Sequence, residues 1–273
     1  MSLQFDSRQR AMLAEMGIRL FDPDLLAASP REAVPTPPVA AVAAGVDNSP
    51  RTSLTSAARN AQPMTRQPVA EPAAARAGIE LLEWDALAQA VASCRACALC
   101  DGRRNTVFGV GDRQPDWLLV GEAPGENEDL QGEPFVGQAG KLLDNMLKSL
   151  GLGRHDKVYI ANVLKCRPPG DRNPEPREIS QCEPFLRRQV ELLQPKIILA
   201  MGPFAVQSLL GSNEPIGKLR GRVHEYLGVP VVVTYHPAYL LRNLPDKAKA
   251  WADLCLALDV MRRQPAAAPA AGR

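Results

Sequence analysis

Apolar and polar positions along the chain form two patterns that predict two kinds of element. Four apolar runs of strand length predict buried strands, at Trp117–Val120, Val158–Val163, Ile197–Met201 and Val229–Thr234. Segments with apolar positions at helical spacing predict helices, at Gly140–Leu150, Pro176–Leu193, Pro203–Leu210 and Pro245–Arg263. This order predicts an α/β fold, a three-layer α/β/α sandwich around a mainly parallel four-stranded central sheet.

Composition divides the 273-residue chain into a part that can bury a core and parts that cannot. Pro, Ala, Ser and Thr dominate residues 23–78, and no aromatic residue occurs between Phe21 and Trp84. Before this stretch, Arg8 to Phe21 has the apolar spacing of a short amphipathic helix. We therefore predict an N-terminal arm at 1–22, a disordered linker at 23–78, a folded domain at 79–263 and a disordered tail at 264–273.

The composition favours a soluble protein and excludes a membrane-spanning one. No apolar run approaches the roughly 18 residues that cross a bilayer, and the charged N-terminus is unlike a secretion signal. We expect no membrane contact and a cytoplasmic, nucleoid-associated location. The formal net charge is only +2, but Lys and Arg outnumber Asp and Glu between Arg154 and Lys249, which permits a local basic face.

Three of the four predicted strands end in polar residues typical of a site. The first is followed by Gly121–Gly125 (GEAPG), the second carries Asn162, and the fourth is followed by His236 and Pro237. Ligands of parallel α/β sheets bind at the carboxyl ends of the strands. We therefore expect these residues to converge on one crevice.

Four of the six cysteines form two pairs. The pairs are Cys94-x2-Cys97 and Cys166-x15-Cys182. Two pairs predict one four-thiolate site, which suits either zinc or an iron–sulfur cluster, and spacing does not choose between them. Spacing also allows Cys100 to replace Cys94 in the first pair, whereas Cys255 stands alone in the last predicted helix and is expected to be a packed free thiol.

Four motifs, in order and at suitable spacing, resemble those of the family 4 uracil-DNA glycosylases, the iron–sulfur branch of that superfamily. They are Gly121–Asp129 (GEAPGENED), Gly132–Gly137 (GEPFVG), Asn162–Pro169 (NVLKCRPP) and His236–Arg242 (HPAYLLR). The resemblance covers about residues 90 to 260. It implies a hydrolase of base excision repair that flips uracil out of DNA, hydrolyses its N-glycosidic bond and leaves an abasic site.

The resemblance also implies a cofactor and its ligands. It favours a [4Fe–4S] cluster over zinc, held by Cys94, Cys97, Cys166 and Cys182, with Cys100 as a spectator. The reaction demands no redox chemistry, so such a cluster is expected to be structural.

Release of uracil gathers negative charge on the departing base, and the site residues match that need. His236 is expected to donate a hydrogen bond to uracil O2, and Phe135 to stack on the flipped base. The amide of Asn162 suits uracil, because it donates to O4 and accepts from N3–H, a pattern that cytosine reverses. Backbone N–H groups around Glu122 and Ala123 are expected to hold a base carbonyl.

Carboxylates after the first strand are candidates for the attacking water. Similarity to the family points to Glu128 for the water and to Glu122 for the pocket wall. The alternative is that Glu126 and Glu128 face solvent on a loop.

The motif after His236 suits DNA contacts. Tyr239, Leu240 and Leu241 are expected to wedge into the gap left by the base, with Arg242 on a phosphate. The alternative is that these apolar residues belong to the core. Arg167 lies in the loop that a cluster would hold against DNA.

Two further expectations concern partners and function. Residues 8–21 resemble the start of the psi subunit of the replicative clamp loader, which predicts a replisome contact. The alternative function is a non-catalytic iron–sulfur DNA-binding protein associated with replication, although the intact set of Glu122, Phe135, Asn162 and His236 favours an enzyme. A monomer is expected.

Overall fold

A computed structural model describes residues 78–264 of the chain. The predicted N-terminal arm with its replisome contact, nearly all of the predicted linker, and the tail from residue 265 lie outside the described residues.

One six-stranded sheet organises these residues, in the order β1-β3-β2-β4-β6-β5. Its four central strands are parallel and match the four predicted strands: β2 (Trp117–Gly121), β3 (Val158–Asn162), β4 (Ile197–Met201) and β6 (Val229–Thr234). Two antiparallel strands, β1 (Val110–Gly111) and β5 (Val223–Tyr226), extend the edges. The predicted count of four strands was too low, because β1 is very short and β5 is a partly exposed edge strand without an apolar run.

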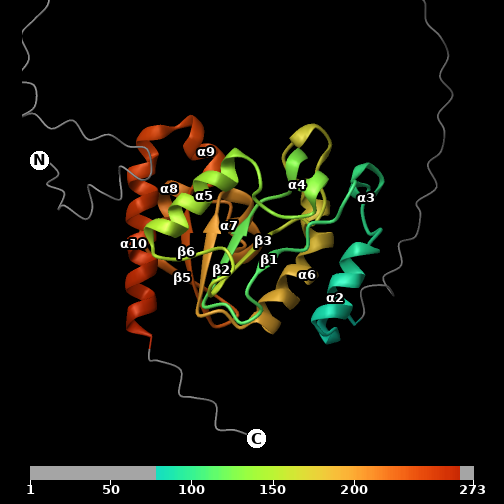
Figure 1. Ribbon diagram of the computed structural model, residues 1–273, viewed down its shortest axis with the longest axis horizontal. Helices are drawn as coiled ribbons and strands as arrows, with labels where there is room; N and C mark the ends of the chain where they lie inside the picture. The colour runs from blue at the N-terminus through green and yellow to red at the C-terminus, as the bar shows by residue number, and fades with distance from the viewer. Residues whose placement is uncertain (1–77, 265–273) are drawn as a thin grey trace, which may run out of the picture. The chain divides into compact units, whose positions relative to one another are not determined.

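Helices cover both faces of the sheet, which confirms the three-layer α/β/α class (Figure 1). Along β2, Leu118 and Val120 pack on one face with α6 (Pro176–Leu193) and α7 (Pro203–Leu210). Trp117 and Leu119 point to the other face, which is covered by α5 (Gln138–Ser149), α9 (Pro237–Arg242) and α10 (Lys247–Arg263). Because successive side chains of a strand alternate between faces, a strand covered on both sides is apolar throughout.

The long helices lie close to their predicted ranges, and several short ones were not predicted. The short elements are η3 (Ile79–Leu81), α2 (Trp84–Ala92), α3 (Leu99–Gly102), α4 (Glu126–Gln131), η4 (Pro169–Asp171), α8 (Ile216–Leu219) and η5 (Leu244–Asp246). Leu87 and Val91 of α2 pack with Phe185 of α6, so α2 lies against α6 at the edge of the domain (Figure 1). No described helix is long and apolar enough to cross a membrane.

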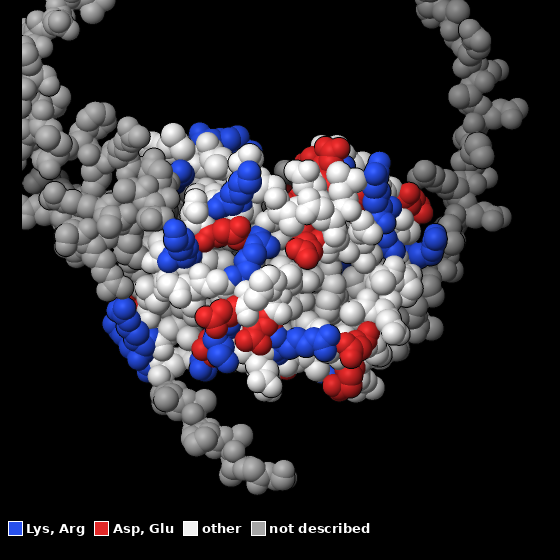
Figure 2. All heavy atoms as spheres, viewed as in Figure 1, with Lys and Arg blue, Asp and Glu red and all other residues white. Residues whose placement is uncertain are grey.

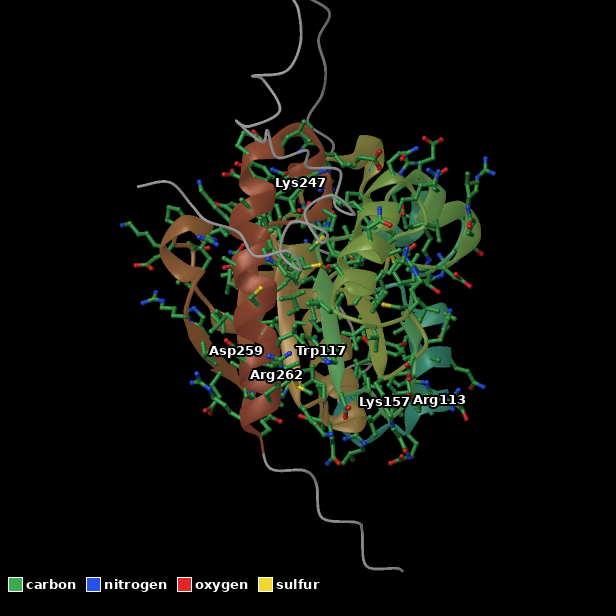
Figure 3. The ribbon with its side chains drawn as sticks, turned by 60° about the vertical axis from the view of Figure 1, so that its left-hand side comes forward. Arg113, Trp117, Lys157, Lys247, Asp259 and Arg262 are labelled. Atoms are coloured by element: carbon green, nitrogen blue, oxygen red, sulfur yellow. The ribbon has the colours of Figure 1, made fainter. Side chains whose placement is uncertain are left out.

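Helix α10 runs antiparallel to the central strands (Figure 3). Arg262 and Asp259, near its end, lie at the same end of the sheet as Trp117, the first residue of β2. Lys247, its first residue, lies at the opposite end. The carboxyl ends of the strands therefore lie at the Lys247 end.

Candidate functional site

The carboxyl ends of the central strands bring four predicted residues together. Gly121, the last residue of β2, is paired in register with Asn162, the last residue of β3. A Cβ at Gly121 would overlap Asn162 Oδ1 and would lie 2.5 Å from Phe135 Cζ, so glycine permits this close approach. The rings of Phe135 and His236 lie 5.4 Å apart between centroids. We call the cluster of Gly121, Phe135, Asn162 and His236 the base pocket, after the role that the sequence predicts for it.

Asn162 presents an unpaired acceptor in this pocket. The residue is 1% exposed. Its Oδ1 is one of the buried side-chain atoms among residues 78–264 that have no hydrogen-bond partner. Leaving a buried acceptor unpaired costs about 1 to 3 kcal/mol. An orphaned oxygen in a pocket is therefore suited to accept a hydrogen bond from a ligand.

Phe135 is held in a backbone conformation that bulky residues rarely adopt, with a φ of 57°. The two amides that follow it, of Val136 and Gly137, donate to Glu128 Oε1 at 2.9 and 3.1 Å. A Cβ on Gly140 would overlap the carbonyl oxygen of Phe135, so α5 begins directly against this turn. The strained turn is therefore fixed on its amide side by a single carboxylate.

An arginine fixes the other side of the same turn. Arg154 donates through Nη1 to Pro134 O at 3.1 Å and through Nη2 to Phe135 O. Its Nε donates to Asp144 Oδ1 at 2.6 Å, which orients the guanidinium from α5. Arg154 could not be identified from the sequence, because nothing in its local pattern indicates a contact with a turn about 20 residues earlier in the chain.

The structure places Glu126 and Glu128 in different surroundings. Glu128 is partly buried, and its Oε2 also accepts the amide of Gly125 at 3.1 Å, which caps α4. Glu126 is exposed, with its carboxylate 3.8 Å from Arg167. The solvent-facing alternative therefore holds for Glu126 and fails for Glu128.

Glu122 follows β2 directly and is followed by Ala123, at the turn into α4. Burial raises the pKa of Glu122 to about 7. A carboxyl group with a pKa near neutral exchanges protons easily at working pH, as general acids and bases do.

His236 is the residue immediately before α9, and its ring lies beside that of Phe135. Its Nδ1 accepts the amide of Ala238 at 3.2 Å, which leaves the proton of a neutral imidazole on Nε2. Burial lowers the pKa of His236 to about 4, with a smaller contribution from the charge of Arg242. The side chain is therefore a neutral hydrogen-bond donor at neutral pH.

The apolar residues after His236 divide between the core and the surface. Leu240 is 0% exposed and belongs to the core under α9, so the prediction that it contacts DNA is corrected. Leu241 is 41% exposed, and Leu244, which the sequence analysis missed, is more so. Tyr239 stacks on Tyr235 at 5.1 Å.

The predicted positive contacts differ in their surroundings. Arg242 is exposed, whereas Arg167 donates to Asp171 Oδ1 at 2.7 Å. Figure 2 shows Lys and Arg side chains interspersed with Asp and Glu on the face in view. On that face no single-sign patch covers the domain.

Five cysteines line one cavity, which we call the cysteine cavity. They are Cys94, Cys97, Cys100, Cys166 and Cys182. The six cysteines are free of disulfide bonds. Cys255 lies in α10 and packs against the core between the sheet and helices α5, α9 and α10. Burial, with smaller contributions from Cys166 and Cys97, raises the pKa of Cys182 to about 12. Within residues 78–264, no group of three or more His, Cys, Asp or Glu side chains is arranged to hold a metal ion.

Two cations that the sequence analysis missed border the cysteine cavity. Arg103 donates to Cys166 Sγ at 3.0 Å and to Cys94 O at 2.9 Å. Lys165 is 1% exposed and lines the same cavity. Its Nζ donates to Asn162 O at 2.9 Å and to Gln189 Oε1 at 2.6 Å.

Comparisons with known proteins agree with the motifs. The sequence model of the Uracil DNA glycosylase superfamily matches residues 108–255. The chain is 46% identical to the type-4 uracil-DNA glycosylase of Archaeoglobus fulgidus over 165 residues, which cover 58% of this chain and 82% of that protein. It is 48% identical to the type-4 enzyme of Sulfurisphaera tokodaii (56% and 73% covered) and 45% identical to that of Thermotoga maritima (62% and 88% covered).

Proposed function

The chain belongs to the uracil-DNA glycosylase superfamily and is a DNA repair glycosylase; we propose that its base pocket receives uracil flipped from DNA and that hydrolysis of the N-glycosidic bond there leaves an abasic site. The observation that carries the proposal is the buried, unpaired Oδ1 of Asn162.

Uracil matches what Asn162 offers. Its N3–H would pair the orphaned Oδ1, and its O4 would accept from the Nδ2 amide of the same side chain. Cytosine has an acceptor at N3 and a donor at position 4, so both pairings would be lost. A site that binds through buried polar groups rejects such an analogue strongly, because those groups stay unpaired.

Phe135 and His236 complete the recognition. The Phe135 ring is proposed to stack on the base, since the strained turn holds it at the pocket edge before DNA arrives. The Nε2–H of His236 is proposed to donate to uracil O2. A neutral imidazole suffices, because this hydrogen bond strengthens as negative charge develops on the leaving base.

We propose Glu122 as the carboxylate that orients the attacking water, and Glu128 as the residue that shapes the pocket wall. This division reverses the one drawn from sequence. Its support is that Glu128 already accepts three backbone amides, whereas Glu122 has a pKa near 7 in a buried position. Ala123 keeps its proposed role, in which its backbone amide holds a base carbonyl.

DNA is proposed to lie against the end of α9, the helix that follows His236. Leu241 is the proposed wedge, and Arg242 the proposed phosphate contact, because both are exposed at that end. Tyr239 remains a candidate contact beside them. Arg167 would have to exchange its ion pair with Asp171 for a phosphate.

A [4Fe–4S] cluster is the cofactor we propose, held by Cys94, Cys97, Cys166 and Cys182. When bound, it would cross-link the loop after β3, α6 and the segment between α2 and α3, and would take no part in the chemistry. The four thiols are not arranged around a metal ion in this structure, but they line one cavity beside the two cations Arg103 and Lys165, and thiolates are the ligands that hold such a cluster. Cys100 donates to Asp101 Oδ1 at 3.4 Å, which supports its role as a spectator.

A uracil-release assay tests the proposal. A labelled oligonucleotide with one uracil is incubated with anaerobically purified protein and then treated with alkali to cut abasic sites. We expect cleavage at uracil, none at cytosine or thymine, and a loss of at least about 100-fold in rate for Asn162→Ala.

Asn145→Ala is the matched control, because Asn145 is exposed on α5 and should keep the wild-type rate. Absence of cleavage by protein that binds DNA and carries iron would instead support the non-catalytic DNA-binding alternative. Nucleoid association and a monomeric state remain predictions.

A further inference from the structure

We propose that Arg103 and Lys165 are the counter-cations of the cysteine cavity, and that Lys165 also ties this cavity to the base-reading Asn162. The proposal rests on the proposed function, since it takes the cysteine-bound group and the role of Asn162 from there. Both residues are positioning residues, and neither touches the base.

Lys165 is a buried cation in need of a negative partner. Its hydrogen-bond acceptors are the neutral oxygens of Asn162, Gln189 and, at 3.4 Å, Phe108. Burying an ammonium group without an anion is costly. Among the described residues that line the cysteine cavity with it, the only side chains that can carry a negative charge are the five cysteines. Cysteines bound to a cluster as thiolates would therefore supply the anion that this buried lysine lacks.

Arg103 contacts one of these cysteines, Cys166, from another segment of the chain. One guanidinium nitrogen donates to Cys166 Sγ, and another donates to the carbonyls of Ala92 and Cys94, at the end of α2. Because the guanidinium is always charged, Arg103 places a fixed positive charge 3.0 Å from Cys166 Sγ. Arg103 thus joins the first cysteine pair to the second.

The charges of the site and its neighbours complement one another. A [4Fe–4S] core with four thiolate ligands carries a net negative charge, and hydrogen bonds and nearby charges tune such a cluster. In a low-dielectric interior that charge needs cations close by. Arg103 and Lys165, which both line the cysteine cavity, provide them.

Lys165 passes this arrangement on to the base pocket. Its ammonium group holds the carbonyl of Asn162, while Gln189 Nε2 donates to Phe108 O at 3.0 Å and so fixes the other acceptor. The backbone of Lys165 is itself held, since its carbonyl accepts the amide of Val107 at 2.8 Å. Removing the ammonium group would leave Asn162 O and Gln189 Oε1 without this donor and would loosen the end of β3.

Lys165→Met and Arg103→Gln test the two parts of the proposal, with Lys157→Met as control. Lys157 is exposed and lies at the Trp117 end of the sheet, away from the cysteine cavity (Figure 3). Three quantities are measured on each holoprotein: the iron content per chain, the rate at which a chelator removes iron, and the inhibition of uracil release by free uracil. The rates of uracil release are normalised to the concentration of iron-loaded chains.

We expect iron loss at least about fivefold faster in both variants, because each loses one cation beside the thiolates. We expect inhibition by uracil to weaken about tenfold in Lys165→Met and to stay within about twofold of wild type in Arg103→Gln. Wild-type iron retention in both variants would overturn the counter-cation role. Wild-type uracil inhibition in Lys165→Met would overturn the tie to Asn162.

A second variant covers the case in which Lys165→Met does not fold. Gln189→Met removes the acceptor at 2.6 Å but keeps the charge of Lys165, so it should weaken uracil inhibition while iron retention stays near wild type. Unchanged inhibition would again reject the tie. If wild-type protein released no uracil, the proposed function would fail, while the iron measurements would still decide the counter-cation role.

Discussion

The base pocket and the cysteine cavity adjoin along one short segment, from Asn162 to Cys166, yet they are built on opposite principles. The pocket lies at the ends of buried parallel strands, and its key groups are a neutral amide, a neutral imidazole and an aromatic ring. The cavity lies between loops and helices, and its lining combines thiols with two cations.

This difference separates preorganisation from dependence on a ligand. The pocket is shaped by the sheet, by the Glu128 and Arg154 clamps on the Phe135 turn, and by glycines at close approaches, so it exists before the base arrives. The cavity is lined by the buried Lys165, whose positive charge a bound cluster would balance. We therefore expect substitutions in the pocket to affect the reaction, and substitutions in the cavity to affect folding.

The largest effects should come from one substitution in each region. Cys182→Ala should lower the free energy of unfolding by about 3 kcal/mol or more, because the proposed cluster would lose a ligand and, with it, the cross-link between α6 and the loop after β3. Asn162→Ala should leave that free energy near wild type while uracil release falls. Denaturant unfolding, with iron content measured in parallel, checks the pair; an unchanged stability for Cys182→Ala would remove the distinction between the two regions.

Glu122→Gln should slow uracil release by about 100-fold, the usual range for loss of a general base. The pKa of Glu122 is about 7, so the carboxylate form grows as pH rises from 6 to 8, and the wild-type rate should rise with it. The variant should show no such rise. His236, with a pKa of about 4, stays neutral throughout this window and should add no second step.

Glu128→Gln is the control that separates the two carboxylates. It removes the charge that holds the amides of Gly125, Val136 and Gly137, so it should lower the rate but keep the wild-type pH profile. If the rise in rate between pH 6 and 8 disappeared in Glu128→Gln and persisted in Glu122→Gln, the roles would be those predicted from the sequence, with Glu128 orienting the water and Glu122 forming the pocket wall.

The sequence predicted the pocket better than the cavity, for a physical reason. The ends of the strands can be predicted from the apolar runs, and their convergence from a parallel sheet, so the sequence predicted that Asn162 and His236 lie at the same end of the sheet. The spacing of the cysteines predicted that they form one site. The charges that accompany them were not, because the contact between Arg103 and Cys166 joins residues 63 apart and leaves no local pattern.

Short elements account for the remaining misses. Leu240 and Leu241 are adjacent and chemically identical, and only the register of the six-residue helix α9 decides which one enters the core. The two edge strands lack the apolar run that marked the four central strands.

Arg154→Met tests whether the Phe135 turn is preorganised. The variant loses the donors to Pro134 O and Phe135 O but keeps an aliphatic side chain of similar length. We expect kcat/KM for uracil release to fall about tenfold, because a misplaced stacking ring costs binding and orientation. Lys148→Met, in the exposed part of α5, is a control for loss of a positive charge, and an equal loss there would point to a general charge effect on DNA binding.

The smallest effect should come from the surface that is proposed to contact DNA. Leu241→Ala should lower the rate of uracil release from duplex DNA about threefold and leave release from single strands unchanged, because a wedge is needed only where a stack must be opened. Leu240→Ala, one residue earlier and in the core, should instead lower stability with normal activity per folded molecule. Single-turnover rates on matched duplex and single-stranded oligonucleotides measure both variants. Equal losses on the two substrates for Leu241→Ala would assign this side chain to general binding, and Leu244, the exposed first residue of η5, would become the candidate wedge.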